Sequence, residues 1–502
     1  MSAAGALGTS ADAFERSRTE FLGLVAFLED EAAGGLAHSE LEGQLQDRGR
    51  ELLLGLFQDH LDLRAVREQR IGMVRDVEGR SRGTVERAHD RALGTVFGKL
   101  SVGRLAYRQR GCENLYPADA SLNLPVESHS HGLRRLAAIE ASRGSFDEAR
   151  KAIGRATCQQ LGKRQIEQLA ARGARDFHAF YAQRQYTATA DEDVLVLSCD
   201  GKGVVMRHDA LRPQTAKAAT SAKLKTRLSK GEKRNRKRMA EVGAVYQAAP
   251  APRTTADVLP HTEPERTDAV CGPVARDKWL TASVVDNAAD VVSQVFGEAD
   301  RRDLAHTRTW VALVDGNNHQ IARIQAEAQA RQLDVAIVCD FVHVIEYLWK
   351  AAWSFHKEGD PAAEAWVRRH AKTILDGAAK RVAATIRRAA TTTGLPPAQR
   401  AGADTCARYL TNKHAYLDYP TALKAGWPIA TGVIEGACRH LVKDRMDLTG
   451  ARWGLQGAEA ILKLRAIRSN NDFDEYWAYH LAQEHQRVHL SRYANRKIPE
   501  AA

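Results

Sequence analysis

Between residues 193 and 346, short apolar runs alternate with amphipathic stretches, and this alternation constrains the fold more than any other feature of the chain. The apolar runs lie at 194–198, 309–314 and 335–339, and the amphipathic stretches at 288–296 and 320–331. Runs rich in Val, Leu and Ile are typical of strands buried on both faces of a sheet, whereas the amphipathic stretches have helical spacing. We therefore expect a layered α/β domain.

Further strand-like residues occur at 203–207 and 244–247, on either side of an interruption at 210–240, and again at 279–285. If the two pieces around the interruption form a hairpin, the order of elements is three strands, helix, strand, helix, strand. This order predicts an RNase H-like α/β core. Within it, Asp200 ends the first strand and Asp315 ends the fourth.

Three acidic residues on separate elements indicate a metal site. Besides Asp200 and Asp315, Glu435 lies in a segment with helical character. Mg²⁺ prefers carboxylate oxygens, and two ions about 3.5–4 Å apart can cut or join phosphodiester bonds. We expect Asp200 to bridge two Mg²⁺ ions, which Mn²⁺ can replace, while Asp315 and Glu435 each hold one.

Asp340 is a rival for the second acid because it also follows an apolar run. Asp315 is the preferred choice, since it closes the strand in fourth position. Asp340 forms an Asp-x-x-His pair with His343, which could orient a substrate group or tune proton transfer. The favoured interpretation places this pair behind the metal ligands, or as a cap on a helix at 341–355.

Positive charge points to a polyanionic partner. The formal net charge is +11, and cations that bind phosphates release counterions from nucleic acid. Basic residues of the interruption, which we predict to contact DNA, include Lys223, Lys225, Arg234 and Arg236. Arg439 and Lys443 follow Glu435 at i+4 and i+8, so a regular helix would place them on its face, although an ordinary ion-paired helix explains them equally well.

Outside the core the chain has predominantly helical patterns. Helices at 146–156, opened by a Ser145–Glu148 capping box, and at 163–180 are compatible with a helix-turn-helix that binds DNA through Lys163, Arg164 and Arg172. A plain helical hairpin is the alternative. The predicted divisions are a helical N-terminal region 1–110, a DNA-binding region 111–188, the core in two parts at 189–349 and 426–470, a helical insertion 350–425 and a helical basic tail 471–502.

Cysteine usage and hydropathy indicate a soluble intracellular protein. The seven cysteines are scattered and form no CxxC pair, which argues against a zinc module or a disulfide framework. The N-terminus lacks a signal-peptide pattern, and no apolar run approaches the length of a membrane span.

Four motifs, in this order, resemble a known family: Ser-Cys-Asp200-Gly-Lys-Gly, Val-Asp315-Gly-Asn-Asn-His, Asp340-x-x-His343 and Thr-Gly-Val-Ile-Glu435-Gly-Ala-Cys-Arg-His. Over about 100–470 the chain resembles bacterial insertion-sequence DDE transposases of the ISKra type, which are related to the Mutator-like enzymes. The broad class has a Cys-x-x-His motif where this chain has Asp340-x-x-His343, with Cys339 just before it. That departure leaves the role of His343 open.

The resemblance implies a Mg²⁺-dependent enzyme that cleaves double-stranded DNA at the ends of a transposon and transfers the strands into target DNA. It also implies a homo-oligomer that pairs two DNA ends, no covalent protein–DNA intermediate, and a cytoplasmic, nucleoid-associated location in a bacterium. Two alternatives remain open: an RNase H-like nuclease or resolvase without strand transfer, and a domesticated DNA-binding protein. The presence of all three acids argues against the second.

Overall fold

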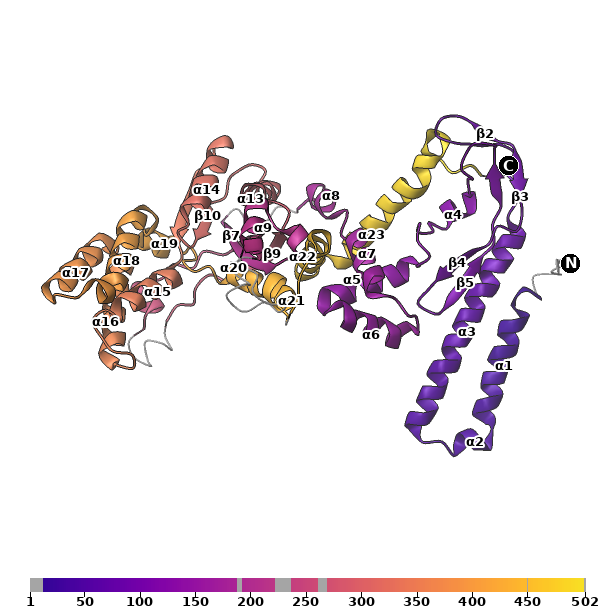
Figure 1. The fold of residues 1–502 in the computed structure, drawn as a ribbon, viewed down its shortest axis with the longest axis horizontal. Coiled ribbons are helices and arrows are strands. Elements are labelled where there is room, and N and C mark those ends of the chain that lie inside the picture. Colours follow the sequence, from indigo (N-terminus) through magenta and orange to yellow (C-terminus); the bar gives the residue numbers. More distant parts are fainter. Residues whose placement is uncertain (1–11, 187–191, 222–235, 261–268, 449, 501–502) are drawn as a thin grey trace. The chain divides into compact units, whose positions relative to one another are not determined.

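The computed structural model describes residues 12–186, 192–221, 236–260, 269–448 and 450–500 (Figure 1). It is a mixed α/β protein, 57% helical, with one five-stranded sheet. The chain divides into two compact units. The first unit comprises Met1–Asp176 with Phe473–Ala502, and the second comprises Phe177–Asp472.

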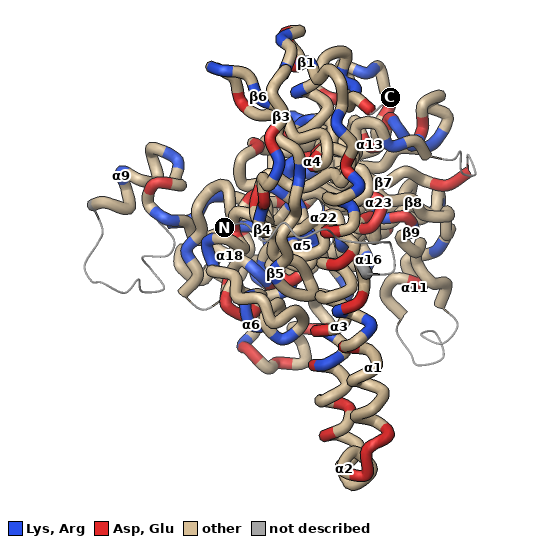
Figure 2. Tube along the Cα trace, turned by 90° about the vertical axis from the view of Figure 1, so that its right-hand side faces the viewer, with Lys and Arg blue, Asp and Glu red and all other residues tan. Residues whose placement is uncertain are grey.

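The first unit begins with a short 3₁₀ turn, Asp12–Phe14, and a helical hairpin of α1, α2 and α3, which cover Glu15–Glu29, Glu31–Gly34 and His38–Arg67. Ser17 and Asp59 join α1 to α3, because the Ser17 hydroxyl donates to Asp59 Oδ2 at 2.5 Å. Acidic residues gather at the α2 tip of this hairpin (Figure 2). This tip therefore carries the wrong sign of charge for contact with DNA.

Short strands follow the hairpin, and they correct the prediction of a helical region as far as residue 110. Strands β1–β6 cover Val74–Arg75, Ser81–Arg82, Thr84–Glu86, Arg91–Gly94, Lys99–Val102 and Ala106–Arg108. They pair antiparallel as β1 with β2, β3 with β6 and β4 with β5. In β5 only Leu100 and Val102 are buried, an alternation with a period of two that is typical of a strand.

Four helices complete the first unit before its C-terminal part. They are α4 Pro117–Ser121, α5 His131–Arg143, α6 Phe146–Thr157 and α7 Lys163–Gly173. The predicted capping box is confirmed, since Ser145 Oγ accepts from the Glu148 amide at 3.1 Å and Glu148 Oε2 accepts from the Ser145 amide at 2.7 Å. The helix predicted over 163–180 is interrupted, because α7 ends at Gly173 and α8 begins at Phe177 in the second unit.

A buried charged cluster joins α5 to the C-terminal segment of the first unit, where α23 Phe473–Glu484 runs into a π-helical turn, His485–His489. Two short 3₁₀ turns, Leu490–Arg492 and Ala494–Arg496, follow it. Asp176 accepts from Arg487 at 2.6 Å and pairs with His480 Nδ1 at 2.7 Å. Arg134, which has no exposed surface, donates to Glu484 at 3.1 Å. We call these five residues the paired cluster.

The second unit is built on the five-stranded sheet. Its strands are β7 Val194–Val205, β8 Lys237–Ala248, β9 Arg276–Ser283, β10 Trp310–Val314 and β11 Val335–Cys339, in the order β11-β10-β7-β8-β9. Strands β7, β8 and β9 are antiparallel, and β10 and β11 lie parallel to β7. Helices α13 Ala288–Arg302 and α14 Asn318–Ala330 connect the later strands. The predicted succession of three strands, helix, strand, helix, strand is confirmed.

The first strand is longer than predicted. Residues 194–198 and 203–207 were expected as separate elements, but β7 runs without a break to Val205 and pairs with β8 along its whole length. Asp200 therefore lies within the strand instead of at its end. The reason is long-range pairing, since Gly201 and Gly203 lie opposite Glu241 and Met239 and are held in the ladder by β8.

Cross-strand pairing shows that α13 and α20, Gly432–Ala437, cover opposite faces of the sheet. Asp200 pairs with Val242, so the neighbouring Gly243 faces the other way. A Cβ on Gly243 would lie 2.5 Å from Val295 of α13, which shows how closely that helix packs. On the Asp200 side, the thiol of Cys438, just after α20, reaches the carboxylate at 3.2 Å.

Helices make up the remainder of the second unit. They are α9 Pro213–Ser221, α11 Thr255–Val258, α15 Phe341–Ala352, α16 Pro361–Leu375, α17 Ala379–Thr392, α18 Pro397–Lys413, α19 Tyr419–Lys424, α21 Asp444–Met446 and α22 Leu455–Ser469, with 3₁₀ turns at His208–Ala210 and His414–Tyr416. In Figure 1, α16, α17 and α18 lie together at one end of this unit. The region 350–425 is thus helical, as predicted.

Within the described residues, no helix is both long enough and apolar enough to cross a membrane.

Candidate metal centre

Three aspartates lie side by side at one edge of the sheet. Leu313 of β10 pairs with Ser198 of β7, so Asp315 and Asp200 each lie two residues beyond a paired position. Val314 pairs with Cys339 of β11, and Asp315 and Asp340 each follow directly. The Asp340 amide donates to the Val314 carbonyl at 2.8 Å, which continues the register to the strand ends.

Asp200 is held by its own strand and by the helical segment that carries Glu435. Its Oδ1 accepts from the Gly201 amide at 2.6 Å, and its Oδ2 accepts from the Cys438 thiol at 3.2 Å. Burial, followed by the negative charge of Asp200, raises the pKa of Cys438, so this thiol stays protonated and acts as a donor. Cys438 lies three residues after Glu435, and this contact brings the first and third predicted acids to the same side of the sheet.

Asp315 is held by the turn that follows β10 and by helix α18. Its Oδ1 accepts from the Asn317 amide at 2.8 Å, and its carbonyl accepts from the Tyr409 hydroxyl at 3.2 Å. Gly316 adopts a φ of +95°, and a Cβ there would lie 2.9 Å from that hydroxyl. Lys413 Nζ donates to Asn318 at the start of α14. The helical insertion therefore fixes the backbone next to Asp315.

Asp340 has no exposed surface and is occupied by protein donors. Its Oδ1 accepts from the Val342 amide at 2.9 Å, which caps α15. Its Oδ2 lies 2.9 Å from His343 Nδ1 and accepts from the Thr431 hydroxyl at 2.5 Å. These contacts show Asp340 as the cap of α15, which is the structural role that the sequence allowed for it.

Glu435 lies beside this pair. Its Oε1 is 3.4 Å from the Thr431 hydroxyl, and possible ligand atoms of Asp340, His343 and Glu435 all lie within 4.8 Å of one another. Within the described residues this is the group of three that could hold an ion as it stands. The three predicted ligands Asp200, Asp315 and Glu435 do not form so tight a group. They lie at one edge of the sheet, but their possible ligand atoms are not all as close together.

His343 is biased toward its protonated form. Burial alone would lower its pKa, but the hydrogen bond to Asp340 and the charges of Asp340, Glu346 and Asp315 raise it above the ordinary value. An imidazolium here would offset part of the negative charge of the site.

Asp340 pairs with His343, and the other three carboxylates of this edge have different surroundings. Among the residues that the structure describes, no Lys or Arg forms a salt bridge with Asp200, Asp315 or Glu435. Asp200 and Asp315 are half-buried and Glu435 is exposed, so their oxygens remain accessible. Accessible carboxylate oxygens without a Lys or Arg partner are of the kind that a hard divalent cation such as Mg²⁺ prefers. We call Asp200, Asp315 and Glu435 the unpaired cluster.

The sequence interpretation missed three side chains of this site. Thr431 contacts Asp340, Cys438 contacts Asp200, and Glu241 lies on β8 next to Val242, the residue that pairs with Asp200. Burial, and to a smaller extent the charge of Asp200, raises the pKa of Glu241. Thr431 lies four residues before Glu435 and Cys438 three residues after it, so each is about one helical turn away. This spacing is the one feature of the sequence that could have indicated both residues.

A π-helical turn at Cys438–Lys443 carries the cations that follow Glu435. A π turn has more residues per turn than an α turn, so the spacing that the prediction assumed for Arg439 and Lys443 is altered through it. The Arg439 side chain is 79% exposed and lies 3.9 Å from Asp444. The prediction that both cations share the Glu435 face stays a prediction, and both side chains are exposed.

The remaining predicted DNA-binding residues have mixed surroundings. Lys163 pairs with Asp147 at 3.0 Å and Arg172 with Glu127, whereas Arg164 is exposed at the start of α7. Arg236 donates to the Ala219 carbonyl of α9 at 3.3 Å. Lys223, Lys225 and Arg234 lie outside the described residues.

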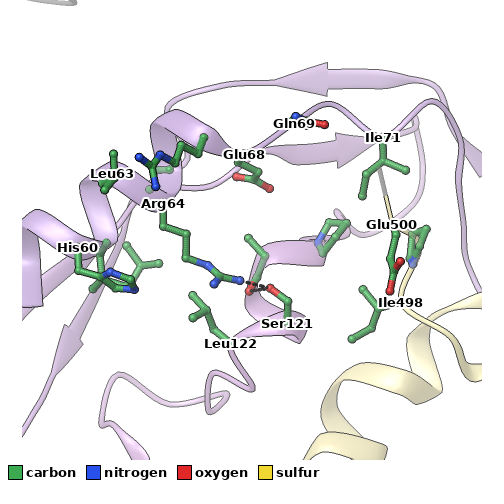
Figure 3. A pocket seen from close by; sticks show the side chains of 18 residues that line it. His60, Leu63, Arg64, Glu68, Gln69, Ile71, Ser121, Leu122, Ile498 and Glu500 are labelled. Atoms are coloured by element: carbon green, nitrogen blue, oxygen red, sulfur yellow. Dashed lines mark hydrogen bonds between the residues drawn. The ribbon is translucent and has the colours of Figure 1, made fainter. Parts of the chain in front are cut away.

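A separate pocket of about 570 Å³ lies in the first unit, lined by α3, α4 and the C-terminal residues (Figure 3). Arg64 reaches across it and donates to the Ser121 hydroxyl at 2.6 Å. Apolar side chains such as Leu63, Leu122 and Ile498 form much of the rest. It contains no group of acids comparable to the unpaired cluster.

Comparison with known proteins gives no family assignment. No family model matches the sequence. No curated protein matches it either.

Proposed function

We propose that this chain is an RNase H-like DDE transposase, which cleaves DNA at the ends of an insertion sequence and joins the strands to target DNA. The observation that carries the proposal is the placement of Asp200 and Asp315 on adjacent strands in register, with Glu435 brought over the same edge by the Cys438 and Thr431 contacts. The strand order β11-β10-β7-β8-β9, with β7–β9 antiparallel and β10 and β11 parallel to β7, supports an RNase H-like core.

Asp200, Asp315 and Glu435 would hold the divalent cations. Bound Mg²⁺ would lower the pKa of water or of a 3′-hydroxyl and stabilise the leaving oxygen. The protein's own part is to orient these carboxylates. The Cys438 thiol and the Gly201 amide fix Asp200, the Asn317 amide fixes Asp315, and Thr431 steadies Glu435.

DNA binding by the first unit is a further part of the proposal. Helices α6 and α7 pack on α5 and are joined by residues 158–162, which supports a helix-turn-helix with α7 as the helix that enters the groove. Arg164 is its exposed cation, while Lys163 and Arg172 would have to leave acidic partners to reach phosphate.

A cleavage assay tests the proposal. The substrate is a supercoiled plasmid that carries the DNA flanking the coding sequence, incubated with the full-length protein and Mg²⁺ or Mn²⁺. We expect nicks at the element's ends and joined products. Asp200→Asn should lower the rate by at least about 10³-fold, because loss of several kcal/mol of metal-dependent stabilisation has that effect, while DNA binding is retained.

Different outcomes separate the alternatives. Nicking without joined products would replace the transposase by a nuclease. Binding without cleavage would indicate a protein that has lost its activity. Asp474→Asn, which removes an exposed acid paired with Arg135, is the control and should leave the cleavage rate unchanged.

A further inference from the structure

Helix α17 in the helical insertion has one buried and one basic face. Its buried residues are Ala379, Val382, Ala383, Ile386 and Ala390. Its exposed basic residues are Lys380, Arg381, Arg387 and Arg388, which we call the α17 face. Lys380 and Arg387 are seven residues apart, as are Arg381 and Arg388, so the two pairs lie on the same side, two turns or about 10 Å apart.

The α17 face lacks acidic partners. Among the described residues none of its four cations forms a salt bridge. The sequence has no Asp or Glu from 377 to 403, although a stretch of 27 residues would hold about three at the chain's average of 62 in 502. The acids on either side are engaged elsewhere. Asp376 accepts from the Thr255 hydroxyl at 2.8 Å, and Asp404 accepts from Arg400 at 3.0 Å.

Electrostatics make this face unfavourable in the free protein. Lys380 and Arg381 stand in the first turn of α17, where the helix dipole disfavours positive charge. The four cations also repel one another, with no acid on the helix to offset them. A bound polyanion would relieve both effects.

We propose that the α17 face binds the phosphate backbone of duplex DNA. The proposal rests on the function proposed above, and it assigns a DNA contact to the helical insertion in addition to those of the first unit and of residues 210–240. A duplex carries one negative charge for about each 1.7 Å of its axis, so the two pairs of cations face about six phosphates. Ala384 and Thr385 are exposed between the two pairs, and their short side chains allow the DNA backbone to approach the helix closely. Three of the four cations are Arg, whose fork of donors matches phosphate oxygens.

The test is the salt dependence of binding to a fluorescent duplex of about 30 bp and random sequence, measured by anisotropy with EDTA present. The full chain is compared with the variant Lys380→Gln/Arg381→Gln/Arg387→Gln/Arg388→Gln. Four phosphate contacts contribute about 3–4 to the slope of log K against log salt, so we expect the variant's slope to be shallower by about three and its affinity to fall at least tenfold.

A control variant removes the same charge from exposed cations elsewhere: Arg75→Gln/Arg110→Gln/Lys278→Gln/Lys424→Gln. Its slope should change by less than about one. Equal slopes for wild type and the α17 variant, or equal changes in the two variants, would overturn the proposal. If the fourfold variant is misfolded by circular dichroism, Arg387→Gln/Arg388→Gln alone should give about half the change. If the wild type cleaves DNA with Mg²⁺ and the α17 variant has the same salt slope as the wild type, this inference is refuted and the proposed function still stands.

Discussion

The paired cluster of the first unit and the unpaired cluster of the second contain similar carboxylates in opposite surroundings. In the paired cluster, Asp176 and Glu484 each accept hydrogen bonds from arginine, and His480 is also bonded to Asp176. Although burial opposes it, these bonds lower the pKa of Asp176 to about 2. In the unpaired cluster, the carboxylates bond to amides, a thiol and a hydroxyl, with no salt bridge from a described Lys or Arg.

This difference distinguishes a structural from a functional role for acidic groups. A buried charge is tolerated when protein cations neutralise it, and it then contributes to the stability of one conformation. Carboxylates that gather without such cations repel one another and gain most from a ligand of opposite charge. The paired cluster should therefore respond to substitution through stability, and the unpaired cluster through metal binding.

The largest expected effect in this comparison is on the paired cluster. Arg134→Ala would remove the fully buried partner of Glu484 and Glu127 and leave them the partly exposed Arg487 and Arg172, so the expected loss is about 3 kcal/mol in the stability of the first unit. Hydrogen–deuterium exchange of the α5 and α23 amides measures this loss. Arg143→Ala, an exposed arginine paired with Glu140, is the control and should cost below about 1 kcal/mol. Similar exchange in both variants would mean that the cluster does not hold the unit together.

A smaller effect concerns pH. Burial, with the nearby charge of Arg134, lowers the pKa of His131 to about 4. Between pH 4 and 6.5 the unfolded chain thus binds more protons at this residue than the folded unit, so stability falls as pH falls through that window. Across this window the unfolding free energy of the wild type should therefore fall by on the order of 2 kcal/mol because of His131, and His131→Gln should remove that change. The measurement is α5 amide exchange from pH 4.5 to 7, with EDTA present; the same pH dependence in the variant would contradict the assignment.

The smallest effect concerns the unpaired cluster and the hydrogen bond that α18 makes to the backbone of Asp315. Tyr409→Phe removes the hydrogen bond to the Asp315 carbonyl while it keeps the ring, which stacks on Tyr347 at 4.1 Å. Loss of one such bond should weaken Mn²⁺ binding by a few-fold, or about 1 kcal/mol. Tyr347→Phe, which keeps the same stack, is the control. Unchanged Mn²⁺ affinity for Tyr409→Phe would mean that the insertion does not help to position Asp315.

Much of the sheet could be predicted from sequence because its strands are short apolar runs bounded by polar residues. The 309–314 and 335–339 runs correspond to β10 and β11 within one residue. The extent of β7 could not be predicted, since Gly201 and Gly203 weaken the local strand pattern and only pairing with β8 extends it. Strands β1–β5 were missed because each is two to four residues long, too short for a visible alternation.

The acidic residues of the candidate site could be predicted from the sequence, but the side chains that hold them in place could not. Position after an apolar run identified Asp200, Asp315 and Asp340, and helical character identified Glu435. The contacts of Cys438 with Asp200 and of Thr431 with Asp340 join residues 238 and 91 positions apart, which no local pattern encodes. The π turn at Cys438–Lys443 could not be predicted either, because its sequence has ordinary helical character.

Metal binding to the isolated protein tests the central claim most directly. The measurement is a Mn²⁺ titration at neutral pH, in which electron paramagnetic resonance reports the free ion, for the wild type, Asp200→Asn/Asp315→Asn and the control Asp147→Asn. We predict that the wild type and the control bind Mn²⁺ equally and that the double variant loses this binding while it remains folded. A wild type that binds no Mn²⁺, or a double variant that binds it as tightly as the wild type, would contradict the assignment of Asp200 and Asp315 as metal ligands.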